Sequence, residues 1–260
     1  MERNGDLKDS SFAIPVIPSE STLVALHLYL SLWGMKGAQI AVLIKKELLS
    51  EWRQRYAING MILYLASTIF VCYMSFGLKA GAIEPLTWNA LFWIIILFTA
   101  VNSVAKSFIQ ESKGRALYFY TIASPAEIII SKIIYNAVLL LILSLVGFGI
   151  YSLVMSRGGD HSSFDYTYFI LALCLGSTGL AASLTMISSI ASKAENSTSL
   201  MAILSFPVIL PLILMVIKLS KNAMDGLERS ASTDELVVLV AINAIIVAVS
   251  YLLFPYLWRS

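Results

Sequence analysis

Six long apolar runs restrict this sequence to one class of protein more firmly than any other feature. A helix needs about 20 apolar residues to cross a hydrocarbon core roughly 30 Å thick. None of the six runs contains Asp, Glu, Lys, Arg or His, and no soluble fold needs six uninterrupted runs of this length. We therefore expect an all-α integral membrane protein, with transmembrane helices at about residues 61–78, 86–105, 133–155, 166–192, 199–217 and 236–257.

The composition agrees with a membrane protein and excludes several other classes. Charged residues make up 13% of the chain and hydrophobic residues 58%, whereas a soluble domain carries about 25% charged residues. So few charges cannot cover a water-facing surface, which excludes an ordinary soluble enzyme and a disordered tail. Two cysteines exclude a disulfide scaffold, and the formal net charge of +2 gives no reason to expect a nucleic-acid partner.

Basic residues predict the orientation in the membrane, because Lys and Arg that flank a span are retained in the cytoplasm. They are concentrated before the first run, over residues 36–55, and between the second and third runs, over residues 106–132. We therefore expect a multi-pass membrane protein with both termini in the cytoplasm. The connection 218–235, on the opposite side, also carries basic residues and weakens this asymmetry.

The N-terminal part divides into an extension and an amphipathic segment. Residues 1–36 are expected to form a poorly ordered extension, and residues 37–257 one six-helix membrane domain. We hypothesise that translation can begin at Met35, which the intact mass of the native protein would test. Within residues 37–56, apolar residues recur every four positions and basic residues lie between them, a pattern typical of a helix in the cytoplasmic membrane interface. The recurring residues are Ile40, Ile44, Leu48 and Trp52.

Several chemistries are excluded because their motifs are missing. The sequence has no G-x-x-x-x-G-K-[ST] loop, so the chain cannot bind and hydrolyse ATP by itself. It has no zinc-binding or Cys-x-x-Cys motif, so we expect no metal site and no catalytic residues. Ion-coupled transporters carry ionisable groups inside the membrane, and the predicted spans have none. Any work done by this protein therefore needs energy from a partner.

Four asparagines are the strongest polar groups inside the predicted spans. Asparagine in a transmembrane helix more often forms a hydrogen bond to a neighbouring helix than it binds a substrate. We expect this interhelical role for all four, which are Asn89, Asn102, Asn136 and Asn243.

The connection between the second and third runs is too long for a simple turn and mixes charges with aromatic residues. Ser124, Pro125 and Glu127 predict a helix start, with serine as the N-cap, proline at the first helical position and glutamate at the third. A broken helix with exposed aromatic side chains would suit a docking surface for a cytoplasmic partner. An interfacial helix anchored by its tyrosines remains an equally good interpretation.

Two of the spans carry features that affect helix packing. The fourth contains small residues at close helical spacing, Gly176, Gly179 and Ser183, which predict a packing face either within the subunit or in a dimer. The fifth contains Pro207 and Pro211, each of which removes a backbone donor. We expect a kink or partial unwinding there, which could serve as a gate.

In this arrangement the chain resembles the membrane subunit of type-2 ATP-binding-cassette exporters. More narrowly, it is similar to the cytochrome c maturation protein B family, also called haem exporter protein B. The resemblance covers about residues 37–257 and includes the proline-bearing run LSFPVILPLIL in the fifth span. The residues of the second connection that carry it are Phe108, Glu111, Gly114, Leu117, Pro125 and Lys132.

The resemblance implies a permease subunit without its own ATP-binding motif. Its implied partners are two copies of a cytoplasmic ABC ATPase that holds the ATP, a second copy of this chain, haem-handling membrane subunits and the lipid bilayer. Haem is the implied cargo rather than a bound cofactor. The cargo either passes through the permease or leaves on a chaperone that ATP-driven motion releases, and spans without a cationic group favour the second mechanism.

Within this family, we expect the connection to couple the permease to its ATPase. Glu111 and Arg115 would supply polar contacts, while Gly114 and Pro125 would determine its shape. Two alternatives are a type-2 permease for another cargo, such as a lipid, polysaccharide or drug, and a membrane scaffold that transports nothing.

Overall fold

The computed structural model describes residues 37, 39–49, 55–77, 83–109, 124–155, 164–192, 197–226 and 229–259. Contacts divide the chain into Met1–Ala38 and Gln39–Ser260, and the elements described here belong to the second unit. A short helix over residues 39–49 is called the interface helix below. The longer elements are α2 (Arg55–Cys72), its π-helical continuation η1 (Tyr73–Gly77), α4 (Pro85–Ile109), α6 (Pro125–Val154), α7 (Tyr166–Ala191), α8 (Ser197–Met224) and α9 (Arg229–Arg259).

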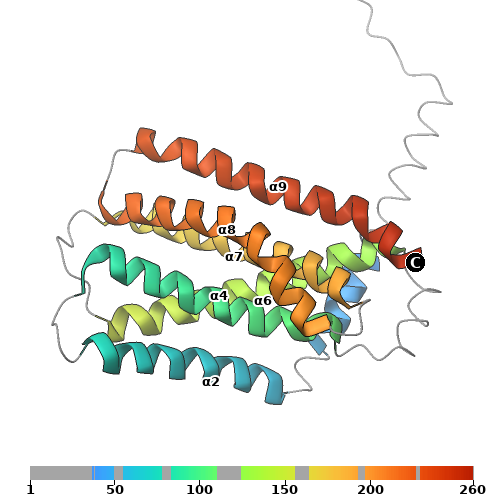
Figure 1. Cartoon of the computed structure of the whole chain (residues 1–260), viewed down its shortest axis with the longest axis horizontal. Coiled ribbons are helices and arrows are strands. Elements are labelled where there is room, and N and C mark those ends of the chain that lie inside the picture. The colour runs from blue at the N-terminus through green and yellow to red at the C-terminus, as the bar shows by residue number, and fades with distance from the viewer. Residues whose placement is uncertain are drawn as a thin grey trace, which may run out of the picture. The chain divides into compact units, whose positions relative to one another are not determined.

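Six candidate spans, preceded by the short interface helix, confirm the predicted fold class. Figure 1 shows them side by side, with α2 and α9 on opposite flanks of the bundle. The central helix is α7, which contacts α4, α6, α8 and α9 and is the most buried of the six. The flanking helices α2 and α9 are the least buried, so most of their apolar surface faces outward.

Successive helices run in opposite directions, which gives the bundle two distinct ends. At one end, Trp88 near the start of α4 donates to the carbonyl oxygen of Met155, just after α6. Toward the other end, Asn136 of α6 donates to Thr185 of α7. We call the first the aromatic end. We call the second the Lys132 end. It includes the start of α6, the interface helix and the last turns of α4, α7 and α9.

The helices are longer than the apolar runs that predicted them. Helix α6 begins at Pro125 rather than at residue 133, and α8 continues to Met224 rather than ending at residue 217. A helix end is determined by its capping and backbone hydrogen bonds, and a charged residue does not terminate it. The predicted spans themselves contain no charged residue, whereas the longer helices include Glu127 and Lys132 in α6 and Lys218 in α8.

Small residues of α7 lie against neighbouring helices within the same chain. A Cβ atom added at Gly176 would lie 2.7 Å from the ring of Trp93 and 2.9 Å from the side chain of Val216. At Gly179 the added atom would lie 2.5 Å from the side chain of Leu212 on α8 and 2.6 Å from that of Asn243 on α9. Ser183 is also fully buried. The small-residue face thus permits close packing of the central helix inside one subunit.

Both prolines of the fifth span lie inside one continuous helix. Helix α8 includes Pro207 and Pro211 without a break, and both side chains are exposed on its outer surface. In Figure 1 the ribbon of α8 changes direction between its two halves. A proline ring clashes with the preceding turn and bends the helix away from it. The helix therefore bends without unwinding.

Candidate functional site

The start of α6 is fixed by a capping box, as the sequence predicted. The backbone N–H of Glu127 donates to Oγ of Ser124 over 3.4 Å, and the N–H of Ser124 donates to Oε2 of Glu127 over 2.9 Å. Pro125 occupies the first helical position, where its missing N–H costs no helical hydrogen bond. The predicted serine cap and first-turn proline are confirmed, and the Glu127 side chain is buried.

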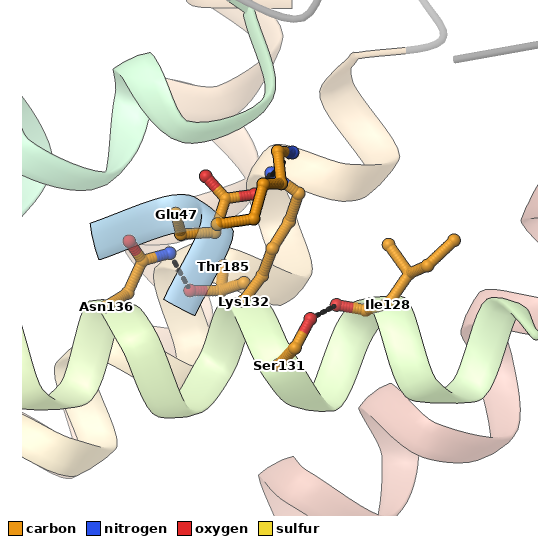
Figure 2. Close-up of polar contacts among 7 residues, drawn as sticks. Glu47, Ile128, Ser131, Lys132, Asn136 and Thr185 are labelled. Carbon is orange, nitrogen blue, oxygen red and sulfur yellow. Dashed lines mark hydrogen bonds and ion pairs between the residues drawn. The ribbon is translucent and has the colours of Figure 1, made fainter. Parts of the chain in front are cut away.

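Lys132 lies two turns further along α6 and is only 2% exposed. Its Nζ atom is 3.5 Å from Oε1 of Glu47, on the interface helix, and Glu47 also accepts from Lys46 over 3.1 Å. Figure 2 shows the Lys132 side chain extending from α6 toward Glu47. Tight charge-assisted hydrogen bonds measure about 2.7–2.9 Å, so this pair is a looser contact between two helices.

A second polar contact attaches the interface helix to the same end of α6. Hydrogen bonding favours the amide orientation of Gln39 in which its nitrogen faces Glu127. In this orientation the amide donates to both carboxylate oxygens of Glu127, over 3.0 and 3.1 Å. Gln39 and Glu47 are two turns apart on the interface helix, so this helix is attached to α6 at two separate points.

One turn beyond Lys132, a hydrogen bond connects α6 to the central helix. Nδ2 of Asn136 donates to Oγ1 of Thr185 over 2.9 Å, and both side chains are buried (Figure 2). Thr185 in turn donates to the carbonyl oxygen of Ala181 on α7. The interface helix, α6 and α7 are thus connected through consecutive polar contacts at the Lys132 end.

The predicted coupling residues have different outcomes. Glu111, Gly114 and Arg115 lie outside the described residues, and Pro125 forms the first turn of α6. From the sequence, Lys132 was expected only to carry the family resemblance, and Glu47 was not singled out. A signal for Glu47 was present, because it lies four residues after Leu43, which packs against the core. An acidic residue on the packed face of an amphipathic helix suggests a buried basic partner.

The aromatic end has a different chemistry. The Tyr151 hydroxyl donates to the carbonyl oxygen of Trp88 over 2.9 Å, while the indole N–H of Trp88 donates to the carbonyl oxygen of Met155 over the same distance. The two rings of this pair are 4.8 Å apart, and further rings from α4, α6 and α7 surround them with centroid separations of 5.6–6.5 Å. The three helices are held together by neutral hydrogen bonds and ring contacts.

A second hydrogen-bond network at the aromatic end includes α8. Ser220 of α8 donates to Oδ1 of Asn89 and accepts from the indole N–H of Trp93, each over 2.9 Å. Nδ2 of Asn89 also donates to the carbonyl oxygen of Ile217 over 3.0 Å. Both polar atoms of the Asn89 side chain are therefore paired with α8.

Comparison with known protein families gives one match. A family model described as CcmB protein matches residues 35–256 of the chain, which include the interface helix and all six candidate spans. No curated protein matches the chain.

Proposed function

The chain belongs to the CcmB protein family, the permease of the haem-exporter ABC system in cytochrome c maturation, and from this premise we propose that ATP-driven motion enters at its Lys132 end. The protein is a multi-pass membrane permease subunit and not the ATPase, and its family implies a partnership with the CcmA ATPase. We propose that this ATPase docks on the connection 110–123 and the adjacent first turn of α6.

The single observation that supports this proposal is the contact between buried Lys132 and partly exposed Glu47. The connection leads directly into the capping box of α6, so a push on it acts on the first turn of that helix. With 30 residues, α6 is about 45 Å long and can carry a displacement across the membrane. Because Glu47 contacts Lys132, a movement of α6 also acts on the interface helix.

We propose an assembly of two permease copies with two ATPase subunits and with haem-handling membrane subunits, in the bacterial inner membrane. In this arrangement the Lys132 end faces the cytoplasm and both chain termini are cytoplasmic. Two features support this orientation. Basic residues are concentrated in the two parts of the sequence that flank the Lys132 end of the bundle, residues 36–55 and 106–132. A cytoplasmic ATPase can reach only the cytoplasmic side of the membrane.

For the transport step, we propose that the permease transmits motion that releases a haem-loaded chaperone. This mechanism was expected because the predicted spans hold no cationic group, and the buried Lys132 lies directly before one of those spans. The geometry supplies a different argument, since Lys132 is directed toward Glu47 within the chain and its charge is engaged there. Neither histidine of the sequence lies in a described helix, so those helices offer no histidine ligand for haem iron.

A charge exchange tests the proposal. Lys132→Glu and Glu47→Lys each place like charges together, and we expect both single variants to insert and bind the ATPase but to lose most c-type cytochrome production. The double variant Lys132→Glu/Glu47→Lys restores opposite charges and should recover much of it. The interaction energy in such cycles is about 0.5–3 kcal/mol. Lys45→Glu, which changes an exposed lysine of the same helix, is the control and should have little effect.

Two further variants test the docking part. Charge reversal at Glu111 or at Arg115 should uncouple ATP hydrolysis from cytochrome production while the permease still inserts into the membrane. Normal cytochrome c maturation in both reversals would contradict docking on the connection. Full activity of both single variants at Lys132 and Glu47 would contradict the transmission through α6.

A further inference from the structure

Of the four asparagines inside the spans predicted from the sequence, three join two helices of the bundle. Asn89 bonds α4 to α8, and Asn136 bonds α6 to α7. Asn243 of α9 donates to the carbonyl oxygen of Leu175 on α7 over 3.2 Å. Asn102 is the exception, because it is exposed and its hydrogen bond to Phe98 stays within its own helix. The exception requires a physical explanation.

The Asn102 side chain is directed along α4 toward the middle of the helix. Its Nδ2 atom donates to the carbonyl oxygen of Phe98, one turn back toward the middle of α4, over 3.0 Å. A side chain directed toward the nearer end of the span would point the other way, toward the last turn of α4. Its carbonyl oxygen accepts no hydrogen bond from the part of the chain that the structure describes. The exposed amide therefore has an acceptor and a second N–H that the described residues do not use.

This position lies inside a candidate span, Pro85–Val104. Polar groups in hydrocarbon are costly unless they find a partner, and transmembrane helices use asparagine for interhelical hydrogen bonds. Asn102 also ends a ridge of exposed side chains at four-residue spacing, with Ile94 48% and Phe98 53% exposed. Ridges of this spacing can interdigitate with an equivalent ridge on another helix.

We propose that the ridge Ile94–Phe98–Asn102 packs against the same ridge of a second copy of this chain. The inference rests on the pairing of two copies in the proposed function and names the surface that forms it. An interface across a two-fold axis brings each residue near its own equivalent. An amide is both donor and acceptor, so two Asn102 side chains can satisfy each other across the axis, which a purely donating or accepting group could not do.

Cysteine cross-linking in membranes that contain the complete transporter tests this interface. Asn102→Cys is introduced into a background in which Cys72 and Cys174 are replaced by alanine, and a short thiol-specific cross-linker is added. The expected result is a covalent dimer of the permease on a non-reducing gel, identified by mass. Leu252→Cys is the matched control, since Leu252 is 65% exposed on α9 toward the same end and should give no dimer.

Three outcomes overturn the proposal: no cross-link at position 102, equal dimer formation at positions 102 and 252, or a cross-link from position 102 to a different subunit. A second measurement uses substitutions without cysteine. Asn102→Leu should speed subunit exchange between labelled permeases several-fold, whereas Asn102→Gln, which keeps an amide, should exchange more like the parent. Equal exchange rates for both would also overturn it.

The result is separable from the proposed function. If the ATPase still co-purifies and is stimulated while position 102 forms no dimer, the interface is wrong and the coupling proposal stands. If the parent permease binds no ATPase, the coupling proposal fails whatever position 102 does.

Discussion

The two ends of the bundle are held together by different kinds of contact. At the aromatic end, neutral hydrogen bonds of 2.9–3.0 Å and tilted or edge-on ring contacts join α4, α6, α7 and α8. A tight ion pair of 2.7 Å between Lys218 and Glu235 joins α8 to α9 at the same end. At the Lys132 end, an ion pair of 3.5 Å and the Gln39 amide attach the interface helix to α6. Two buried hydroxyls near the ends of α4 and α7, those of Ser103 and Ser188, have no hydrogen-bond partner in the described structure.

This difference separates a fixed end from an adjustable one. Ring packing and short hydrogen bonds define one arrangement, and any change of that arrangement breaks several contacts at once. A loose ion pair and unused hydroxyl groups can be rearranged at a lower cost, because fewer optimal contacts are lost. The account therefore assigns the ATP-driven movement to the Lys132 end and the role of a pivot to the aromatic end.

The largest expected effect comes from removing the central ring of the aromatic end. Trp88→Ala deletes a buried side chain that contacts rings of three helices, and substitutions of this kind cost about 3–5 kcal/mol. We expect a large drop in the thermal unfolding temperature of the purified permease in detergent. Leu153→Ala, at an 88% exposed position of the same end, should unfold like the parent. Equal stability of both variants would contradict a fixed aromatic end.

A smaller loss is expected where the central helix passes closest to its neighbours. The new methyl group in Gly176→Ala meets Trp93, whose ring is held by Ser220, so the ring cannot simply move aside. Overpacking of this kind costs about 1–3 kcal/mol. Gly149→Ala is the matched control, because nothing lies within 4 Å of the added atom. The same melting assay should separate the two, and an unchanged Gly176→Ala would show that the packing is looser than described.

The smallest of the three effects concerns the Lys132 end. Ser124→Ala removes one side-chain acceptor of the α6 capping box and should cost about 1 kcal/mol. We expect a small change in unfolding temperature but a clear fall in cytochrome c production, because the first turn of α6 receives the motion. Ser152→Ala, at an exposed serine near the other end of α6, should leave production normal. Equal production in both variants would weaken the distinction between the ends.

Features encoded by local sequence were predictable. Hydropathy gave the six spans, and the spacing of Ser124, Pro125 and Glu127 gave the start of α6, because capping depends on neighbouring residues. The same hydropathy misplaced the ends of α6 and α8. It treated Lys132 and Lys218 as boundaries, although a charged side chain with a partner can continue inside a helix.

Features that depend on tertiary contacts were not predictable. The partner of Lys132 lies 85 positions earlier in the chain, and hydrophobic periodicity carries no information on such a pairing. Likewise, all four asparagines had the same sequence signature, yet three bond to another helix and Asn102 faces outward. Only the packing of the helices distinguishes these roles.

Intramolecular distances measured by spin labels at the two ends test the central claim most directly. One label pair at positions 42 and 252 reports on the Lys132 end, and another at 153 and 166 reports on the aromatic end. All four side chains are exposed in the parent structure. Labelled permease is mixed with an excess of unlabelled copies and assembled with its ATPase. The account predicts that trapping the ATPase in its ATP-bound state shifts the distance between positions 42 and 252 and leaves that between 153 and 166 unchanged. A shift at the aromatic end with none at the Lys132 end would contradict it.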